Sequence, residues 1–161
     1  SYVTGGGNVN LTGSPDYAAR VLVTGDPGSG CDSNPVKQFN TAPFKGPAAN
    51  SVGLESPSGY LRGCFVSSMD LAIARTIQLA RGRSIQIRLD VFNAFKQAAI
   101  TNRITNMQLS SPADPLTIQN LPYNPDGSVN QSLALPRGAG FGVATAYQTP
   151  RSAQLQFRFA F

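Results

Sequence analysis

Few side chains in this sequence could carry out acid–base or metal chemistry. The 161-residue chain has no histidine and only two cysteines, Cys31 and Cys64. Two cysteines and no histidine cannot supply a zinc site of four nitrogen and sulfur ligands. Without histidine, no serine or threonine has the base that most often activates a nucleophile. The sequence therefore favours neither a metal centre nor a hydrolase, and we expect no cofactor.

The acidic side chains also give little indication of catalysis. We expect Arg88 and Asp90 to lie on opposite faces of a strand, so that their side chains do not converge. Three aspartates (Asp16, Asp26 and Asp32) lie among turn-forming residues, where aspartate usually shapes the backbone. We therefore predict that the chain is not an enzyme.

Two loop motifs resemble ligand-binding sequences only superficially. Oxygen-bearing residues alternate at 124–130, as in a calcium loop, but carboxylates are too few and NPDGS at 124–128 indicates an ordinary turn. A glycine-rich stretch at 136–142 lacks the strand-then-helix context of a phosphate loop. We therefore predict no metal site and no phosphate cradle.

The two cysteines lie in Gly- and Ser-rich text, GSGCDSN and LRGCFVS. In an oxidising compartment Cys31 and Cys64 would form one disulfide that closes a long loop, whereas in a reducing compartment they would stay free thiols. We favour the disulfide.

The charge pattern argues against nucleic acid as a partner. The net charge is +5 and the pI is about 9.6, yet the 13 Lys and Arg residues are scattered singly. Nucleic-acid patches need basic residues that cluster. Only 13% of residues are charged, and Gly and Pro number 16 and 12, which indicates long loops around a few strands.

Three segments alternate apolar and polar residues with the period of a β-strand: 68–79, 83–95 and 151–161. The aliphatic residues of these segments occupy odd positions and the polar or small residues mostly even ones, while Phe92 is an aromatic residue at an even position. The charged residues of the polar set are Asp70, Arg88, Asp90 and Arg158. Arg75 is the exception, because it is charged and falls on the apolar face.

Parity fixes the connection between the first two strands. The apolar residues of both strands have odd numbers, so the numbers of two paired residues on this face must sum to an even number. A two-residue turn would pair odd with even numbers and is therefore excluded. A three-residue loop, Ala80–Gly82, places Ile77 opposite Ile85 and Ile73 opposite Leu89. We expect a type I turn with Gly82 in the left-handed region.

Outside these three segments the sequence predicts mostly loops. Residues 1–66 are predicted as a loop-rich segment with short strands, and 67–161 as the barrel strands with a long loop at 97–150. The fold class is all-β. A soluble sandwich would cover the apolar face with a second sheet, whereas an outer-membrane barrel exposes it to lipid. Strand length, the charged polar faces and the contrast of one tight turn with long loops favour the barrel.

Four segments in order resemble the C-terminal region of TonB-dependent outer-membrane receptors, particularly the Oar-like group. They are FNTAPF at 39–44, MDLAIARTIQLARGRSIQIRLDVFNAF at 69–95, GFGVATAYQTPR at 140–151 and QLQFRFAF at 154–161. The terminal alternation is similar to the signal that the barrel assembly machinery reads, which implies that role for Leu155, Phe157, Phe159 and Phe161.

The resemblance implies a plugged barrel in the bacterial outer membrane that binds or imports a substrate with energy from the TonB complex. Its partners would be membrane lipid, the missing strands and plug, and the assembly machinery. The four charges of the polar face would then point into the lumen. Three strands cannot close a barrel, because such transporters have about 22 strands. The alternative is a subunit of an extracellular β-rich filament or other homo-oligomer that pairs through its open edges.

Overall fold

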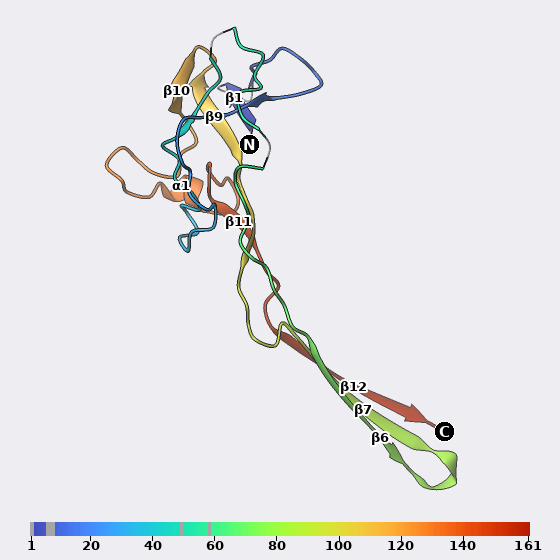
Figure 1. Cartoon of the computed structure of the whole chain (residues 1–161). Coiled ribbons are helices and arrows are strands. Elements are labelled where there is room, and N and C mark those ends of the chain that lie inside the picture. The colour runs from blue at the N-terminus through green and yellow to red at the C-terminus, as the bar shows by residue number, and fades with distance from the viewer. Residues whose placement is uncertain (1, 6–8, 49, 58) are drawn as a thin grey trace. The chain divides into compact units, whose positions relative to one another are not determined.

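The computed structural model describes residues 2–5, 9–48, 50–57 and 59–161. As predicted, the chain is all-β, with one four-residue helix and one short 3₁₀ turn in the described part. It divides into two compact units (Figure 1). Unit 1 comprises residues 1–64 and 100–147, and unit 2 comprises residues 65–99 and 148–161.

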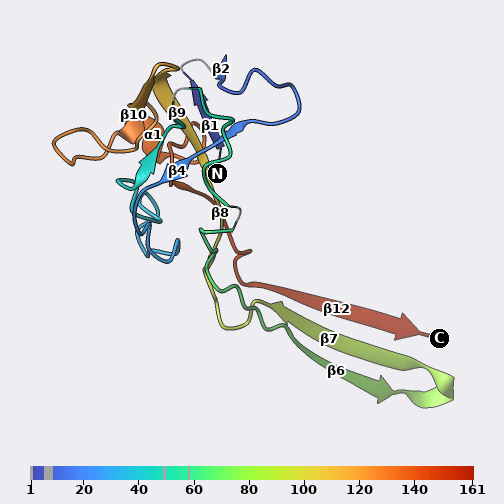
Figure 2. The ribbon, with the colours of Figure 1, turned by 45° about the horizontal axis from the view of Figure 1, so that its top comes forward.

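Unit 2 is a three-stranded antiparallel sheet in which β7 lies between β6 and β12 (Figure 2). The strands are β6 (Leu71–Gln78), β7 (Ser84–Phe92) and β12 (Ser152–Ala160). All three predicted strands are therefore confirmed, although each is shorter by up to three residues at its ends.

The hairpin register is also confirmed. Ile73 pairs with Leu89 and Ile77 with Ile85. The Leu79 amide donates to the Arg83 carbonyl at 2.7 Å and closes the three-residue loop. The predicted type I turn is wrong, because Arg81 has φ of 64° in addition to the expected positive φ of Gly82. Two successive left-handed residues give the chain reversal a twist that suits the flanking strands.

Unit 1 contains all the remaining elements. They are β1 (Tyr2–Gly5), β2 (Val9–Asn10), β3 (Ala19–Arg20), β4 (Leu22–Val23), β5 (Phe44–Lys45), β8 (Ile100–Arg103), β9 (Asn106–Ser111), β10 (Asp114–Ile118), α1 (Gln131–Ala134) and β11 (Ala144–Tyr147). The range 97–150 is thus not simply a loop. Its strands are short and irregular, so no long alternation marks them in the sequence.

The strands of unit 1 join its two chain segments. A sheet runs β10-β9-β1-β2, and β3 also pairs with β1. Val3 of β1 pairs in parallel with Met107 of β9. β8 pairs with β11, and β4 pairs with β5. Because β1 and β9 belong to different segments, neither segment can form this sheet by itself.

The core of unit 1 is made of apolar side chains from both segments. They are Val3, Ala19, Val21, Phe39, Phe44, Met107, Leu109 and Phe141. Three of these rings pack edge to face or tilted, with centroids 5.2–5.3 Å apart: Phe39, Phe44 and Phe141. Such contacts add to the free energy gained by burying the rings.

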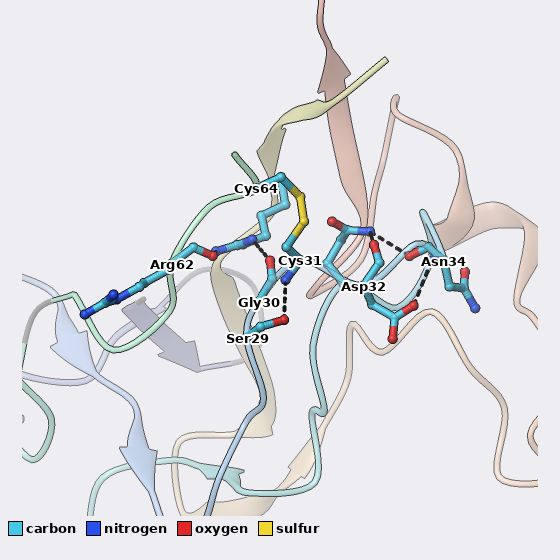
Figure 3. The surroundings of a disulfide bond; sticks show 9 residues. Ser29, Gly30, Cys31, Asp32, Asn34, Arg62 and Cys64 are labelled. Carbon is cyan, nitrogen blue, oxygen red and sulfur yellow. Dashed lines mark hydrogen bonds between the residues drawn. A yellow bond between two sulfur atoms is a disulfide. The ribbon is translucent and has the colours of Figure 1, made fainter. Parts of the chain in front are cut away.

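Cys31 and Cys64 form the predicted disulfide, with their Cα atoms 4.9 Å apart (Figure 3). Arg103 of the other segment binds backbone carbonyls close to both cysteines. Its guanidinium donates to the carbonyls of Gly30 and Arg62 and lies 5.7 Å from the centroid of the Phe39 ring. Burial lowers the pKa of Arg103, and the two carbonyl acceptors offset that desolvation.

Replacing both cysteines by serine should destabilise unit 1. The bond closes a loop between cysteines 33 residues apart, and releasing that constraint costs about 3–4 kcal/mol in the chain-entropy description. Hydrogen exchange should show faster exchange at Met107 and Leu109 in the Cys31→Ser/Cys64→Ser variant, and little change at Leu89 of unit 2. Unchanged protection at Met107 would contradict a stabilising role for the bond.

Candidate functional site

The odd-numbered side chains of unit 2 form one continuous apolar face. The register aligns Ile73, Leu89 and Leu155 in one row across the sheet. The next rows toward the tight turn are Arg75–Ile87–Phe157 and Ile77–Ile85–Phe159. Ile73 and Phe157 are each 70% exposed. An uncovered apolar face of this kind marks contact with lipid or with another protein.

The height of this face suits a membrane. β7 and β12 have nine residues each. A strand of that length measures roughly 30 Å at about 3.3 Å per residue. At the tilt of about 40° found in barrels it spans roughly 23 Å, close to the outward apolar band of about 25 Å. Within the described residues no helix is long and apolar enough to cross a membrane.

Exposed aromatic residues lie at the tight-turn end of the sheet and in the segments beyond its other end. Phe159 and Phe161 lie at the tight-turn end, with ring centroids 6.1 Å apart. Phe65 and Phe95 lie beyond the other end of β6 and β7 and are 88% and 65% exposed. Membrane barrels carry aromatic girdles at the two interfaces.

The opposite face of the sheet is polar. Its rows are Ala72–Asp90–Gln154, Ala74–Arg88–Gln156 and Thr76–Gln86–Arg158. Arg88 Nε donates to both carboxylate oxygens of Asp90 at 2.9 Å, and Nη2 lies 2.9 Å from Oδ1. The expectation that Arg88 and Asp90 do not converge is wrong, because side chains two residues apart on a strand share a face.

Arg75 does lie on the apolar face, as its parity predicts, between the rows that contain Ile73 and Ile77. Its neighbours across the sheet are Ile87 and Phe157. An arginine stem can lie along apolar surface while the guanidinium reaches toward the interface. The turn end of the sheet is roughly 13 Å away, four residues along the strand.

Asn93 organises the end of the sheet away from the tight turn. Its side chain is buried; Nδ2 donates to the carbonyls of Gln97 and Thr149, and Oδ1 accepts from the Gln97 amide. The Asn93 amide donates to the Asp70 carboxylate at 2.9 Å. Asn93 thus holds the exit of β7 against the segment that enters β12. The DVFNAF phrase contains this residue, but nothing in the sequence alone indicates these partners.

The predicted site residues therefore fall into three groups. Arg88, Asp90 and Arg158 share the polar face, while Asp70 precedes β6 and binds the backbone of Asn93. The predicted assembly-signal residues (Leu155, Phe157, Phe159 and Phe161) are exposed. Their reading by an assembly machinery and the lumen-facing direction of the charges stay predictions.

The two ends of the sheet differ in their connections. Ala160 pairs with Ser84, so the last residues of β12 lie at the same end as the tight turn. The long connections of β6, β7 and β12 all leave at the opposite end. Amphipathic antiparallel strands with short turns at one end and long segments at the other define the outer-membrane type of β-barrel.

The comparison with protein families agrees with this class. The family model of the outer membrane beta barrel domain matches residues 2–156, and the chain belongs to this family. Neither the curated proteins nor the solved structures contain a significant match.

Two neighbouring substitutions should separate the faces of the sheet. Ile73→Arg places a charge on the apolar face, where arginine costs about 2–4 kcal/mol at the membrane midplane. Ala72→Arg places the same charge on the polar face beside Asp90. The unfolding free energy in lipid vesicles, followed by urea titration, should fall for Ile73→Arg and change by less than about 1 kcal/mol for Ala72→Arg. Equal losses of unfolding free energy in the two variants would contradict the prediction that the apolar face contacts lipid.

Proposed function

We propose that this chain is the C-terminal part of an Oar-like, TonB-dependent outer-membrane receptor that binds or imports a substrate through a plugged barrel. The observation that carries the proposal is the register of β6, β7 and β12, which places every large aliphatic residue of the three strands on one exposed face. Membership in the outer membrane beta barrel domain family supports it. No catalytic role is proposed.

The receptor assignment rests on the ordered segments that resemble that group. Several residues of these segments have defined structural roles. Phe39 and Phe44 lie in the core of unit 1, and Asn93 binds the segment before β12. In this proposal the polar face with Arg88, Asp90 and Arg158 lines the lumen. Lipid, neighbouring strands, the plug and the barrel assembly machinery are the partners. Energy from TonB would act through the plug.

The proposal also assigns an orientation. In outer-membrane barrels the short turns are periplasmic and the long loops extracellular. The turn Ala80–Gly82 would then face the periplasm, and the long connections of β6, β7 and β12 would begin on the extracellular side. A disulfide in unit 1 suits that oxidising side, where disulfides persist.

The second candidate is a subunit of an extracellular β-rich filament or homo-oligomer. The open edges favour it, since β6 and β12 each pair only with β7 within the described residues. Unpaired edges of long strands are templates for pairing with further copies. In that arrangement the apolar face would be covered by protein and not by lipid.

Cysteine labelling on cells distinguishes these two candidates. Arg137→Cys in unit 1 and Arg81→Cys in the tight turn introduce thiols at two exposed positions. A membrane-impermeant maleimide should label Arg137→Cys on intact cells, and label Arg81→Cys only after the outer membrane is permeabilised. Labelling of both on intact cells would favour the filament and contradict the receptor proposal.

The gene itself offers an independent test. A receptor requires the plug and most of the barrel strands, so the open reading frame should extend upstream by several hundred residues and begin with a signal peptide. Sequencing the complete gene checks this directly. An open reading frame of about the present length with its own signal peptide would reject the receptor and leave the filament.

A further inference from the structure

Unit 1 contains a groove of about 640 Å³ between its two chain segments. Phe44 and Lys45 of β5, with Lys37 and residues 40–42, form the side from the first segment. Leu116 and Ile118 of β10, with Leu121, Tyr123 and Gly127, form the side from the second. Small-molecule sites commonly have volumes of about 300–1,000 Å³ and mostly apolar walls with a few polar groups. The volume of this groove and its combination of apolar and polar lining residues fall within that description.

The apolar part of the groove is rigidly supported. Phe44 is 2% exposed and packs against Phe39 and Phe141 in the aromatic core. The backbone beside it is held to the opposite segment, because the Gly46 amide donates to the Pro115 carbonyl at 2.7 Å. Leu116 is 64% exposed, so it offers apolar surface to whatever enters the groove.

The loop 122–130 forms a preorganised wall. Tyr123 and Val129 pair as an antiparallel bridge, and the Asn130 amide donates to the Pro122 carbonyl at 2.9 Å. The Asp126 carboxylate accepts from the amide and hydroxyl of Ser128 and closes the turn. The turn predicted at 124–128 is thereby confirmed. A wall held in this way loses little conformational entropy when a ligand binds.

The charge of the lining is positive. Among the described residues that line the groove, Lys37 and Lys45 are charged and none carries a carboxylate. Neither lysine forms a salt bridge within the described part of the chain, where Arg88 pairs with Asp90. Burial, and secondarily the charge of Asp32, raise the pKa of Tyr123, so its hydroxyl is neutral at physiological pH. The two lysines of the lining outnumber the one carboxylate whose charge reaches it, Asp32, so the groove prefers an anion.

We propose that this groove binds a small anionic amphiphile, namely a carboxylate attached to an aromatic or short aliphatic group. The apolar group would lie against Phe44, Leu116 and Leu121, and the carboxylate would bind Lys37 and Lys45. The extracellular position of the groove rests on the proposed function, but the binding itself does not. A purified chain can therefore test it whatever the cellular location proves to be.

The test uses 4-phenylbutyrate as the probe and the full chain in micelles of an uncharged detergent. Methyl resonances of Leu116, Ile118 and Leu121 report the binding by NMR, so they localise it to the groove. The alcohol and amine analogues, 4-phenylbutanol and 4-phenylbutylamine, are matched ligands with a neutral and a positive head group. We expect saturable shifts with 4-phenylbutyrate, weaker binding of the alcohol and the weakest binding of the amine.

Three variants with the same loss of one charge complete the design. Lys37→Gln and Lys45→Gln should each raise the dissociation constant of 4-phenylbutyrate up to about fivefold, the upper range for an exposed ion pair. Arg137→Gln, in the same unit but outside the groove, should leave it unchanged. Near-ultraviolet circular dichroism of the aromatic core confirms that each variant is folded.

Several results would overturn the proposal. They are no shift at Leu116 with any probe, equal binding of the acid, alcohol and amine, or an Arg137→Gln effect equal to those of the lysine variants. These outcomes are separate from the failure of the receptor proposal, which the cell-labelling experiment measures.

Discussion

The parity of the β6–β7 hairpin is the constraint on which unit 2 depends. A three-residue loop keeps odd positions opposite odd positions, and the pairing of β12 with β7 continues the same rule across the sheet. Because strand side chains alternate in direction, a slip of one residue would move every apolar group to the polar face. The continuous exposed apolar face and the polar rows on the opposite side of the sheet follow from that register.

Much of unit 2 could be predicted from the sequence because its information is local. Period-two alternation runs through whole strands, and the loop length follows from arithmetic on residue numbers. The left-handed conformation of Arg81 could not be predicted, since an arginine carries no preference for positive φ comparable to glycine's. The contacts of Asn93 were equally inaccessible, because Thr149 lies 56 residues further along the chain.

The strands and the groove of unit 1 could not be predicted from the sequence. Its strands have two to six residues, too few for a period to be recognised. Its groove combines Lys37 and Lys45 with Leu116 and Tyr123, which come together only through β1–β9 pairing and the shared core. The cysteines were the exception, since chemistry and not periodicity singled them out. Arg103, which crosses the ends of their loop, has no sequence signal at all.

The parallel pairing of β1 with β9 also determines an order of events during folding. The β6–β7 hairpin joins neighbours in the chain, so closing it orders only a three-residue loop. Val3 pairs with Met107, a partner about one hundred residues later, and the core of unit 1 also needs Phe141. Contacts at such separation close slowly because a long loop must be ordered first. The Cys31–Cys64 bond shortens that search, since it restricts the conformations of the first segment.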